Sequence, residues 1–501
     1  MPKYETIIGL EIHLQLKTKS KMFCSCSNDG ENQPPNTTIC PVCLGHPGTL
    51  PTVNEEAVKQ GLSLALALHC QINQQSKFDR KNYFYPDLPK GYQISQFDVP
   101  LAHDGYLIIK TDHQKKRIRL ERVHLEEDAA KNIHQGNKTL VDFNRGGTPL
   151  AEIVTRPDFD QPTEAKQFLQ QLRLIARYLG VSDADMEKGQ LRCDANISLR
   201  PQGDQKLYPK TEIKNLNSFK AVEKALEFER QRQEKLWEQK KPPQLTSTRG
   251  WDENRGETVE QRTKESFADY RYFPEPDLPP LVIKESLINQ AQSLMPELPL
   301  EREERFIKEY GLLPPDAEVL IKQKNWADYY EAVMSDFRAW LFKANGLSEV
   351  SEQAAQLWQK HKAFLAKLAV NWITTEVFRL ISKDFKWNDF KITAENMAEF
   401  LSLIYQKKIN SSAAQTILKQ MFASGDDPSN IAEKLDLAQI DDVSTLEDLA
   451  TKVIMMHPDQ AKQYRSGKEA LIKFFVGKLM QESKGRANPL AAEEILRKKI
   501  K

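Results

Sequence analysis

Apolar residues occupy every second position from Ile8 to Leu16, and polar residues such as Glu11 and His13 fall between them. A period of two is typical of a β-strand with one buried face. The other face would then carry a carboxylate and an imidazole about 7 Å apart. An edge strand with a solvated polar face has the same pattern. This stretch alone therefore leaves both a metal- or phosphate-binding face and an ordinary exposed face open.

A second polar-faced strand is expected over 117–128. Its apolar phase shifts after Leu120, which predicts a β-bulge, and beyond the shift His124, Glu126 and Asp128 share one face. Acidic groups gathered at a strand end are costly unless they are solvated or bound to a cation. A plain acidic strand end is the alternative.

The segment 191–200 predicts a third strand of this kind, with Arg192 and Asp194 on its polar face. The basic, glycine-rich turn around Arg145 leads into another short strand, and Lys81 lies in a loop of mixed cations and aromatic residues. Carboxylates on strands can hold Mg²⁺, which neutralises the charge on transferring phosphoryl oxygens, and nearby cations can bind phosphates. The repeated pattern favours a Mg²⁺-dependent phosphoryl-transfer sheet.

Four of the six cysteines are clustered in the sequence as two close pairs. Cys24 and Cys26 are separated from Cys40 and Cys43 by a loop of 13 residues. Thiolates spaced in this way suit a tetrahedral structural Zn²⁺ site beside the first strand. Four reduced cysteines without metal are the alternative.

Helical patterns dominate the second part of the chain, after the composition shifts near residue 296. A shorter helix is expected at 54–69 with Asn54 as N-cap, and a charged one after Ser218, with its charge in solvent. From Ala461 to Lys501 eleven Lys and Arg residues stand against four Glu, a net charge of +7. A basic tail of this kind is either a solvated surface or a nucleic-acid contact.

Composition limits the class of protein. The chain has 501 residues and a net charge of +1, so nucleic-acid binding would depend on local patches. No long apolar run predicts a membrane span and no secretory signal is apparent, so we expect a cytoplasmic protein. No Walker A, GxGxxG or GxSxG motif is present. The competing class is a non-enzymatic RNA-binding adaptor.

Seven segments, in order along the chain, resemble the GatB family, the B subunits of aspartyl/glutamyl-tRNA(Asn/Gln) amidotransferases. The similarity of 467–489 to the family's terminal helical domain extends it over essentially the full length. The tail departs from the family pattern at Lys473-Phe474-Phe475, where small or Leu/Gly residues are common in the family. The seven segments are 7–18, 78–96, 124–131, 142–158, 191–201, 212–219 and 269–281.

The resemblance implies an α+β fold in three domains. Residues 1–292 would form a glutamine-synthetase-like cradle with an antiparallel sheet and the zinc loop. An all-α helical domain (293–405) and an all-α, YqeY-like tail domain (406–501) would follow. The four cysteines match the zinc-bearing branch of the family, which implies a structural Zn²⁺.

It also implies an activity and partners. Such an enzyme uses ATP and Mg²⁺ to phosphorylate the side-chain carboxylate of mischarged Glu-tRNA(Gln) or Asp-tRNA(Asn). Ammonia released from glutamine by the amidase subunit GatA then displaces phosphate and gives Gln-tRNA or Asn-tRNA. GatC completes the heterotrimer, and the tail contacts tRNA.

The family motifs assign roles to individual residues of this sequence. Glu11, His13 and one or both of Glu126 and Glu127 would be catalytic Mg²⁺ ligands. The expected nucleotide and phosphate contacts are Lys81, Arg192 and, as a weaker candidate that could also bind metal, Asp194; the expected tRNA contacts are Lys468, Lys484 and Arg486.

Overall fold

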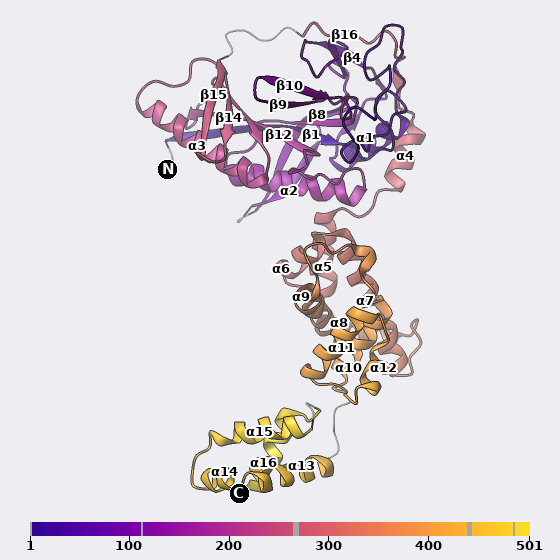
Figure 1. Ribbon diagram of the computed structural model, residues 1–501, viewed down its shortest axis with the longest axis vertical. Helices are drawn as coiled ribbons and strands as arrows, with labels where there is room; N and C mark the ends of the chain where they lie inside the picture. The colour runs from indigo at the N-terminus through magenta and orange to yellow at the C-terminus, as the bar shows by residue number, and fades with distance from the viewer. Residues whose placement is uncertain (1–2, 112–113, 264–269, 438–442, 484–485, 501) are drawn as a thin grey trace. The chain divides into compact units, whose positions relative to one another are not determined.

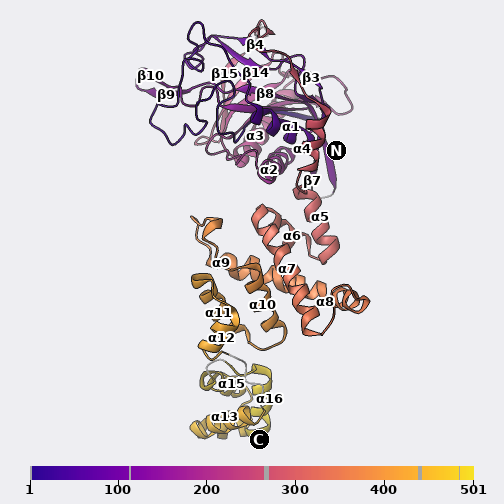
Figure 2. The same ribbon diagram turned by 90° about the vertical axis from the view of Figure 1, so that its right-hand side faces the viewer.

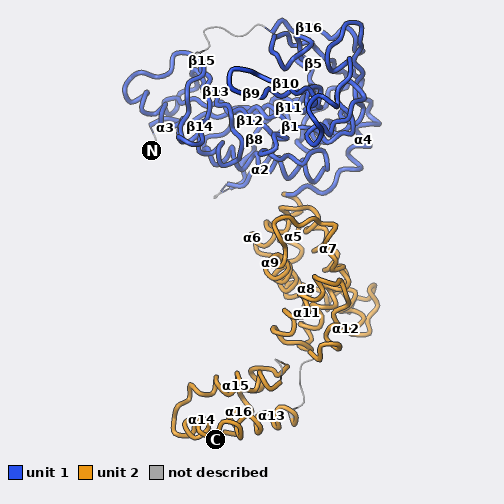
Figure 3. Tube along the Cα trace, in the orientation of Figure 1, with its two compact units in different colours: residues 1–299 blue, residues 300–501 orange. Residues whose placement is uncertain are grey.

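The computed structural model describes residues 3–111, 114–263, 270–437, 443–483 and 486–500. These residues form two compact units, 1–299 and 300–501, shown in different colours in Figure 3. The first unit combines a large sheet with helices, and the second is helical, as the predicted α+β class requires. The predicted division of the helical part near residue 405 stays a prediction.

A ten-stranded sheet organises the first unit (Figure 1). Its strand order is β15-β14-β13-β12-β1-β11-β8-β6-β2, and β7 pairs with β8 outside this path. The first strand of the sequence thus lies in the middle of the sheet. The strands are β1 (Tyr4–Gln15), β2 (Gln71–Ile72), β6 (Ala102–His103), β7 (Tyr106–Lys110), β8 (Lys115–Glu127), β11 (Pro149–Thr155), β12 (Leu191–Pro201), β13 (Thr211–Leu216), β14 (Ser247–Asp252) and β15 (Glu257–Thr263).

Two predicted strand features, the alternation in β1 and the bulge in β8, are confirmed. Every second residue of β1 from Ile8 to Leu14, and Leu16 just beyond it, is at most 1% exposed. The predicted β-bulge in β8 is present, because Val154 pairs with Arg122 whereas the next residue, Thr155, pairs with Leu120. The expectation of an antiparallel sheet fails at one pair, since β13 and β14 run parallel. Parallel neighbours need a crossover connection, and helix α3 (Phe219–Glu238) provides it.

Helices α1 (Glu55–Ala67), α2 (Pro162–Leu179) and α3 pack on the apolar side of the sheet and leave the other face to polar residues. Asn54 and Ser218 cap α1 and α3 as predicted, each accepting hydrogen bonds from backbone amides of the first turn. The expectation that the charges of α3 lie in solvent is wrong for Glu229. This residue is fully buried and is bound by Arg232 and Thr258. Helix α4 (Glu285–Ser293) packs against α1.

Three small sheets complete the first unit. The strand pair β9 (Lys131–Gln135) and β10 (Lys138–Asp142) forms a hairpin. A second sheet has the order β16-β4-β5, and the third joins β17 to β3. The proline-rich segment after residue 269 therefore contributes only short strands, in agreement with the prediction of an extended loop; Asp269 itself lies outside the described residues. The bounds are β3 (Gln75–Ser76), β4 (Asp79–Asn82), β5 (Tyr92–Ser95), β16 (Phe273–Pro274) and β17 (Leu281–Val282).

The second unit consists of helices throughout its described residues. Figure 2 shows α7 beside α10, two helices that pack together, and α13 to α16 share a separate small hydrophobic core. No helix in the described ranges is long and apolar enough to cross a membrane. The helices are α5 (Pro299–Tyr310), α6 (Pro314–Ile321), α7 (Lys324–Ala344), α8 (Glu352–Asn371) continued by a π-helical turn (Trp372–Val377) and α9 (Phe378–Leu380), a 3₁₀ turn (Trp387–Asp389), α10 (Ala394–Tyr405), α11 (Ser411–Ser424), α12 (Pro428–Lys434), α13 (Val443–Met456), α14 (Pro458–Arg465), α15 (Leu471–Glu482) and α16 (Pro489–Ile500).

Candidate active site on the polar face of the sheet

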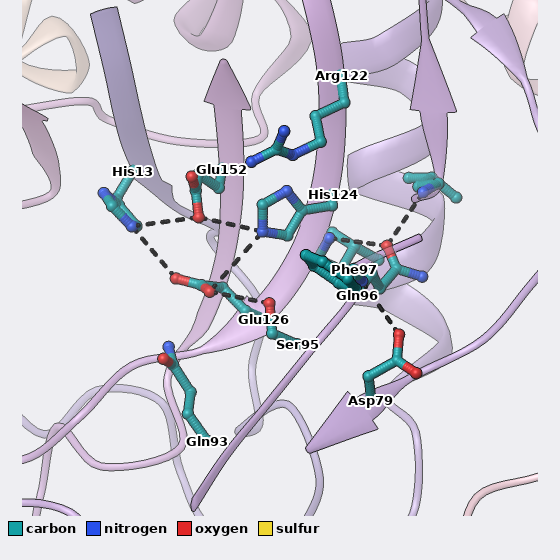
Figure 4. Close-up of polar contacts among 12 residues, drawn as sticks. His13, Asp79, Gln93, Ser95, Gln96, Phe97, Arg122, His124, Glu126 and Glu152 are labelled. Carbon is teal, nitrogen blue, oxygen red and sulfur yellow. Dashed lines mark hydrogen bonds and ion pairs between the residues drawn. The ribbon is translucent and has the colours of Figure 1, made fainter. Parts of the chain in front are cut away.

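Three neighbouring strands bring His13, Glu126 and Glu152 together on the polar face (Figure 4). His13 on β1 pairs in register with Glu152 on β11, and Glu126 follows on β8. The Nε2 atom of His13 lies 3.3 Å from Glu126 Oε1 and 3.5 Å from Glu152 Oε2. One potential ligand atom from each of the three residues lies within 4.8 Å of the others. We call these three residues the acidic cluster.

A second imidazole, that of His124 on β8, contacts both carboxylates of the cluster. His124 Nε2 lies 3.0 Å from Glu152 Oε2 and 3.8 Å from Glu126 Oε2. Ser95 donates a hydrogen bond of 3.1 Å to the same Glu126 oxygen. Gln96 fixes the strand itself, because its Oε1 accepts from the backbone amide of Leu125, between His124 and Glu126.

Burial and the two imidazoles determine the charges in the cluster. Burial alone would raise the pKa of Glu152, but the charge of His124, its hydrogen bond and the charge of His13 together lower the pKa to about 2. Glu126 behaves in the same way, and its hydrogen bonds with His124 and His13 hold its pKa well below the ordinary value. For His124 burial opposes protonation, yet the charge of Glu152 raises the pKa to about 9. Both carboxylates therefore stay ionised at neutral pH, paired with the imidazoles of His13 and His124.

This donor set fits a divalent cation. The two carboxylates are the ligands that Mg²⁺ uses in phosphoryl-transfer sites, where water and phosphate oxygens take the remaining coordination positions, and the imidazole nitrogen of His13 is a further donor. Within the described part of the chain, the buried Nδ1 of His124 has no hydrogen-bond partner. His124, at the border of the cluster, thus has one ring nitrogen that the described contacts leave unsatisfied.

Glu11 and Glu127, the other predicted Mg²⁺ ligands, lie outside the cluster. Glu11 is on the same face of β1, where it accepts a 3.0 Å hydrogen bond from Asn196 and lies 3.7 Å from Lys210 Nζ. Glu127 faces away from Glu126, because successive strand residues point to opposite sides. It forms an ion pair with Lys90 and accepts a hydrogen bond from the Ile94 amide.

The predicted phosphate-binding cations border the polar face. Burial lowers the pKa of Lys81, but the charge of Glu126, with a smaller contribution from Glu152, raises it above its ordinary value, so Lys81 is charged beside the cluster. Arg192 Nη2 lies 2.8 Å from Asp128 Oδ2. Asp194 is paired with Lys214 at 2.6 Å and so lies among cations. These side chains place positive charge around the two buried carboxylates.

A cavity of about 1030 Å³ opens next to Glu11. Its polar lining includes Arg122, Asn196 and Lys210, and its apolar lining includes Leu207. A cleft with this size and mixed lining accommodates a drug-sized or nucleotide-sized ligand.

Sequence reasoning missed Glu152. The short strand that carries it is buried on both faces from Pro149 to Ile153, so no alternation marked a polar side. A single acid within an apolar run was the available signal, because buried carboxylates are rare unless they are paired or bind metal. His124 was recognised on the polar face but received no role.

The four cysteines converge as the sequence predicted. One sulfur atom from each lies within 4.8 Å of the others, and the sulfurs of Cys40 and Cys43 are 3.9 Å apart. Tetrahedral Zn²⁺ with Zn–S bonds of about 2.3 Å requires a separation of about 3.8 Å. The Cys24 thiol, then the Cys40 amide and the Lys21 charge, lower the pKa of Cys43 to about 4 against the opposing effect of burial. The group is therefore suited to a tetrahedral metal.

The structure describes two of the three residues that were predicted to contact tRNA in the tail. Lys468 is exposed, whereas Arg486 forms a 2.6 Å ion pair with Asp436. Lys484 lies outside the described residues.

Comparison with known proteins places the chain in a family. The family model described as "GatB/GatE catalytic domain" matches residues 6–289, and the one described as "GatB domain" matches residues 355–500. The aspartyl/glutamyl-tRNA(Asn/Gln) amidotransferase B subunit of Carboxydothermus hydrogenoformans is 45% identical over 100% of this chain and 99% of its own length. The protein of the same name from Thermotoga maritima is 44% identical over 99% of each chain. The chain therefore belongs to the GatB family, the B subunits of aspartyl/glutamyl-tRNA(Asn/Gln) amidotransferases.

Proposed function

We propose that this chain phosphorylates and then amidates the side-chain carboxylate of Glu-tRNA(Gln), Asp-tRNA(Asn) or both, with ATP as phosphoryl donor. The observation that supports this most directly is the acidic cluster, in which two buried, ionised carboxylates and an imidazole meet on a sheet face bordered by cations. The family membership supplies the substrate class, since the relatives' names specify aspartyl/glutamyl-tRNA(Asn/Gln) amidotransferase.

His13, Glu126 and Glu152 would hold Mg²⁺, and Glu11 is a further candidate from the same strand face. A bound Mg²⁺ would neutralise charge on the phosphoryl oxygens during transfer. Lys81 and Arg192 bind and orient phosphate oxygens at the border of the cluster. The cavity beside Glu11, which is lined by Arg122 and Lys210, would give the nucleotide room on the same strand as His13.

The chemistry proceeds in two displacements. A carboxylate oxygen of the aminoacyl group attacks the γ-phosphorus of ATP, the bond to the bridging oxygen breaks, and ADP leaves. Ammonia then attacks the activated carbonyl carbon, loses a proton, and displaces inorganic phosphate. Activation is needed because a free carboxylate is a poor acyl donor, and preorganised charges stabilise the transition state more than the ground state.

The partners follow from the same proposal. The glutaminase subunit GatA would supply ammonia from glutamine, and GatC would complete a cytoplasmic heterotrimer. The four cysteines would bind a structural Zn²⁺, because a closed set of four thiolates leaves no open coordination position. The tail, with Lys468 exposed and Lys484 and Arg486 nearby in sequence, would contact tRNA.

The test is ATP consumption by the assembled complex. ADP formation should require Mg²⁺ and aminoacylated tRNA, and deacylated tRNA should not replace it. Glu126→Gln should abolish this ADP formation while glutamine hydrolysis by the glutaminase component remains. An RNA-binding adaptor would bind tRNA without consuming ATP under any of these conditions.

A further inference from the structure

A lysine with no exposed surface lies directly beside the four cysteines. The Lys21 side chain is 0% exposed, and its Nζ lies 3.8 Å from Cys43 Sγ and 3.3 Å from the carbonyl oxygen of Phe143. Among the residues that the structure describes, no carboxylate forms an ion pair with it. An ammonium group buried without an opposite charge is very unfavourable, so a negative partner is required.

The thiolates are the negative groups within reach. Cys43 Sγ accepts a hydrogen bond of 3.2 Å from the Cys40 backbone amide, so it already has one donor, and the Lys21 ammonium is the second. Four thiolates around Zn²⁺ carry a net charge of −2. One ammonium group beside them brings the net charge of the site to −1. An ammonium group at this position would compensate part of the negative charge of such a half-buried metal centre.

The backbone holds Lys21 in this position. Its amide donates a 3.0 Å hydrogen bond to the carbonyl oxygen of Cys26, another of the four cysteines. Its stem runs past Gly147, where a Cβ atom would lie 3.4 Å from Lys21 Cδ. The conformation of Gly147, with φ +85°, also disfavours any other residue there. The ammonium is therefore placed beside Cys43 by the cysteine loop and by the glycine turn together.

We propose that Lys21 is the internal counter-ion of the four-cysteine metal site and protects its zinc from loss. The inference rests on the proposed zinc occupancy. Hydrogen bonding and positive charge draw electron density from the Cys43 sulfur, which makes the thiolate a weaker nucleophile toward oxidants and alkylating agents. The same charge favours the negatively charged metal-bound form over the metal-free form.

The test measures zinc release from the full-length chain to a chromogenic chelator, with and without a thiol-alkylating reagent. Lys21→Met should release zinc about tenfold faster or more, the size expected for losing a hydrogen bond to a charged acceptor. Lys19→Met is the matched control, since Lys19 is exposed two residues away, and it should release zinc at the wild-type rate. Wild-type release from Lys21→Met would overturn the proposal.

A second comparison separates charge from packing. Lys21→Gln keeps a donor for the Phe143 carbonyl but loses the charge, and it too should release zinc faster; wild-type behaviour would mean that Lys21 is structural only. Lys21→Met should lower the melting temperature of the zinc-bound protein more than that of the chelator-treated protein, in which the four-thiolate centre with its net charge of −2 is absent. An equal decrease in both forms would contradict the proposal. A wild-type chain purified without any zinc would instead refute the zinc assignment beneath it.

Discussion

Glu152→Gln tests the acidic cluster at the one of its three residues that the sequence did not predict. The carboxamide has nearly the shape of the carboxylate, so the change removes charge from a buried site without leaving a cavity. Glu152 Oε2 lies 3.0 Å from His124 Nε2 and 3.5 Å from His13 Nε2. The variant should fold, with the pKa of His124 falling toward its ordinary value because its nearest carboxylate is gone.

The loss of metal affinity can be worked out from the charge. Two unit charges about 4 Å apart attract by about 4 kcal/mol at an effective dielectric constant of about 20. Losing about half to all of that attraction for a bound cation weakens the affinity by about 30- to 1000-fold. Because Glu126 remains, some binding should persist, so the main effect is a higher Mg²⁺ requirement for ATP consumption.

The assay measures Mn²⁺ binding to the assembled complex and the Mg²⁺ dependence of ADP formation with aminoacylated tRNA. Glu5→Gln is a suitable control, because Glu5 lies near the start of strand β1, which also carries His13, but is paired with Arg200. It should leave both measurements unchanged. If Glu152→Gln binds Mn²⁺ and uses Mg²⁺ like the wild type, Glu152 is no metal ligand and the reasoning from the cluster fails.

Four further changes test other parts of the structure. Glu11→Gln should reduce tRNA-dependent ADP formation, and full activity would remove Glu11 from the proposed site. Asn144→Ala should lower the unfolding free energy by about 1–3 kcal/mol in a denaturant titration, because Asn144 Oδ1 accepts from the backbone amides of two residues of the cysteine loop. Ser218→Ala should cost about 1 kcal/mol by the same method through the lost cap of α3. Lys468→Ala should weaken tRNA binding and reduce its salt dependence by about one counterion, whereas an unchanged slope in a salt titration would exclude a phosphate contact.

Local patterns predicted the elements of the fold well. The alternation in β1, the bulge in β8 and the caps Asn54 and Ser218 all depend on residues close together in sequence. The parallel pairing of β13 with β14 was missed, because strand neighbours are decided by the crossover through α3 and not by either strand's own residues. Burial of Glu229 was missed for the same reason, since its partner Thr258 comes from another element.

The alternation of apolar and polar residues along β8 also predicted more about the site than the family motif did. The phase placed His124 and Glu126 on one face, and that is where the structure has them. The HLEED motif left Glu126 and Glu127 as equal candidates for a Mg²⁺ ligand. The strand geometry distinguishes them, because only Glu126 faces the cluster. Glu127 turns toward Lys90, on the opposite side of the strand from the acidic cluster.

Glu11 and His13 show where sequence information ends. They lie on the same face of one strand, and the sequence pattern predicts both equally as metal ligands. Cross-strand neighbours decide between them: His13 lies opposite Glu152, whereas Glu11 lies opposite Val154 on the same strand. A shift of β11 by two residues would keep every apolar side chain on its own face and would give Glu11 the acidic neighbour in place of His13. The composition of the cluster is thus a property of register: the pairing of β11 with β1 and with β8 makes His13 and His124 the cross-strand neighbours of Glu152.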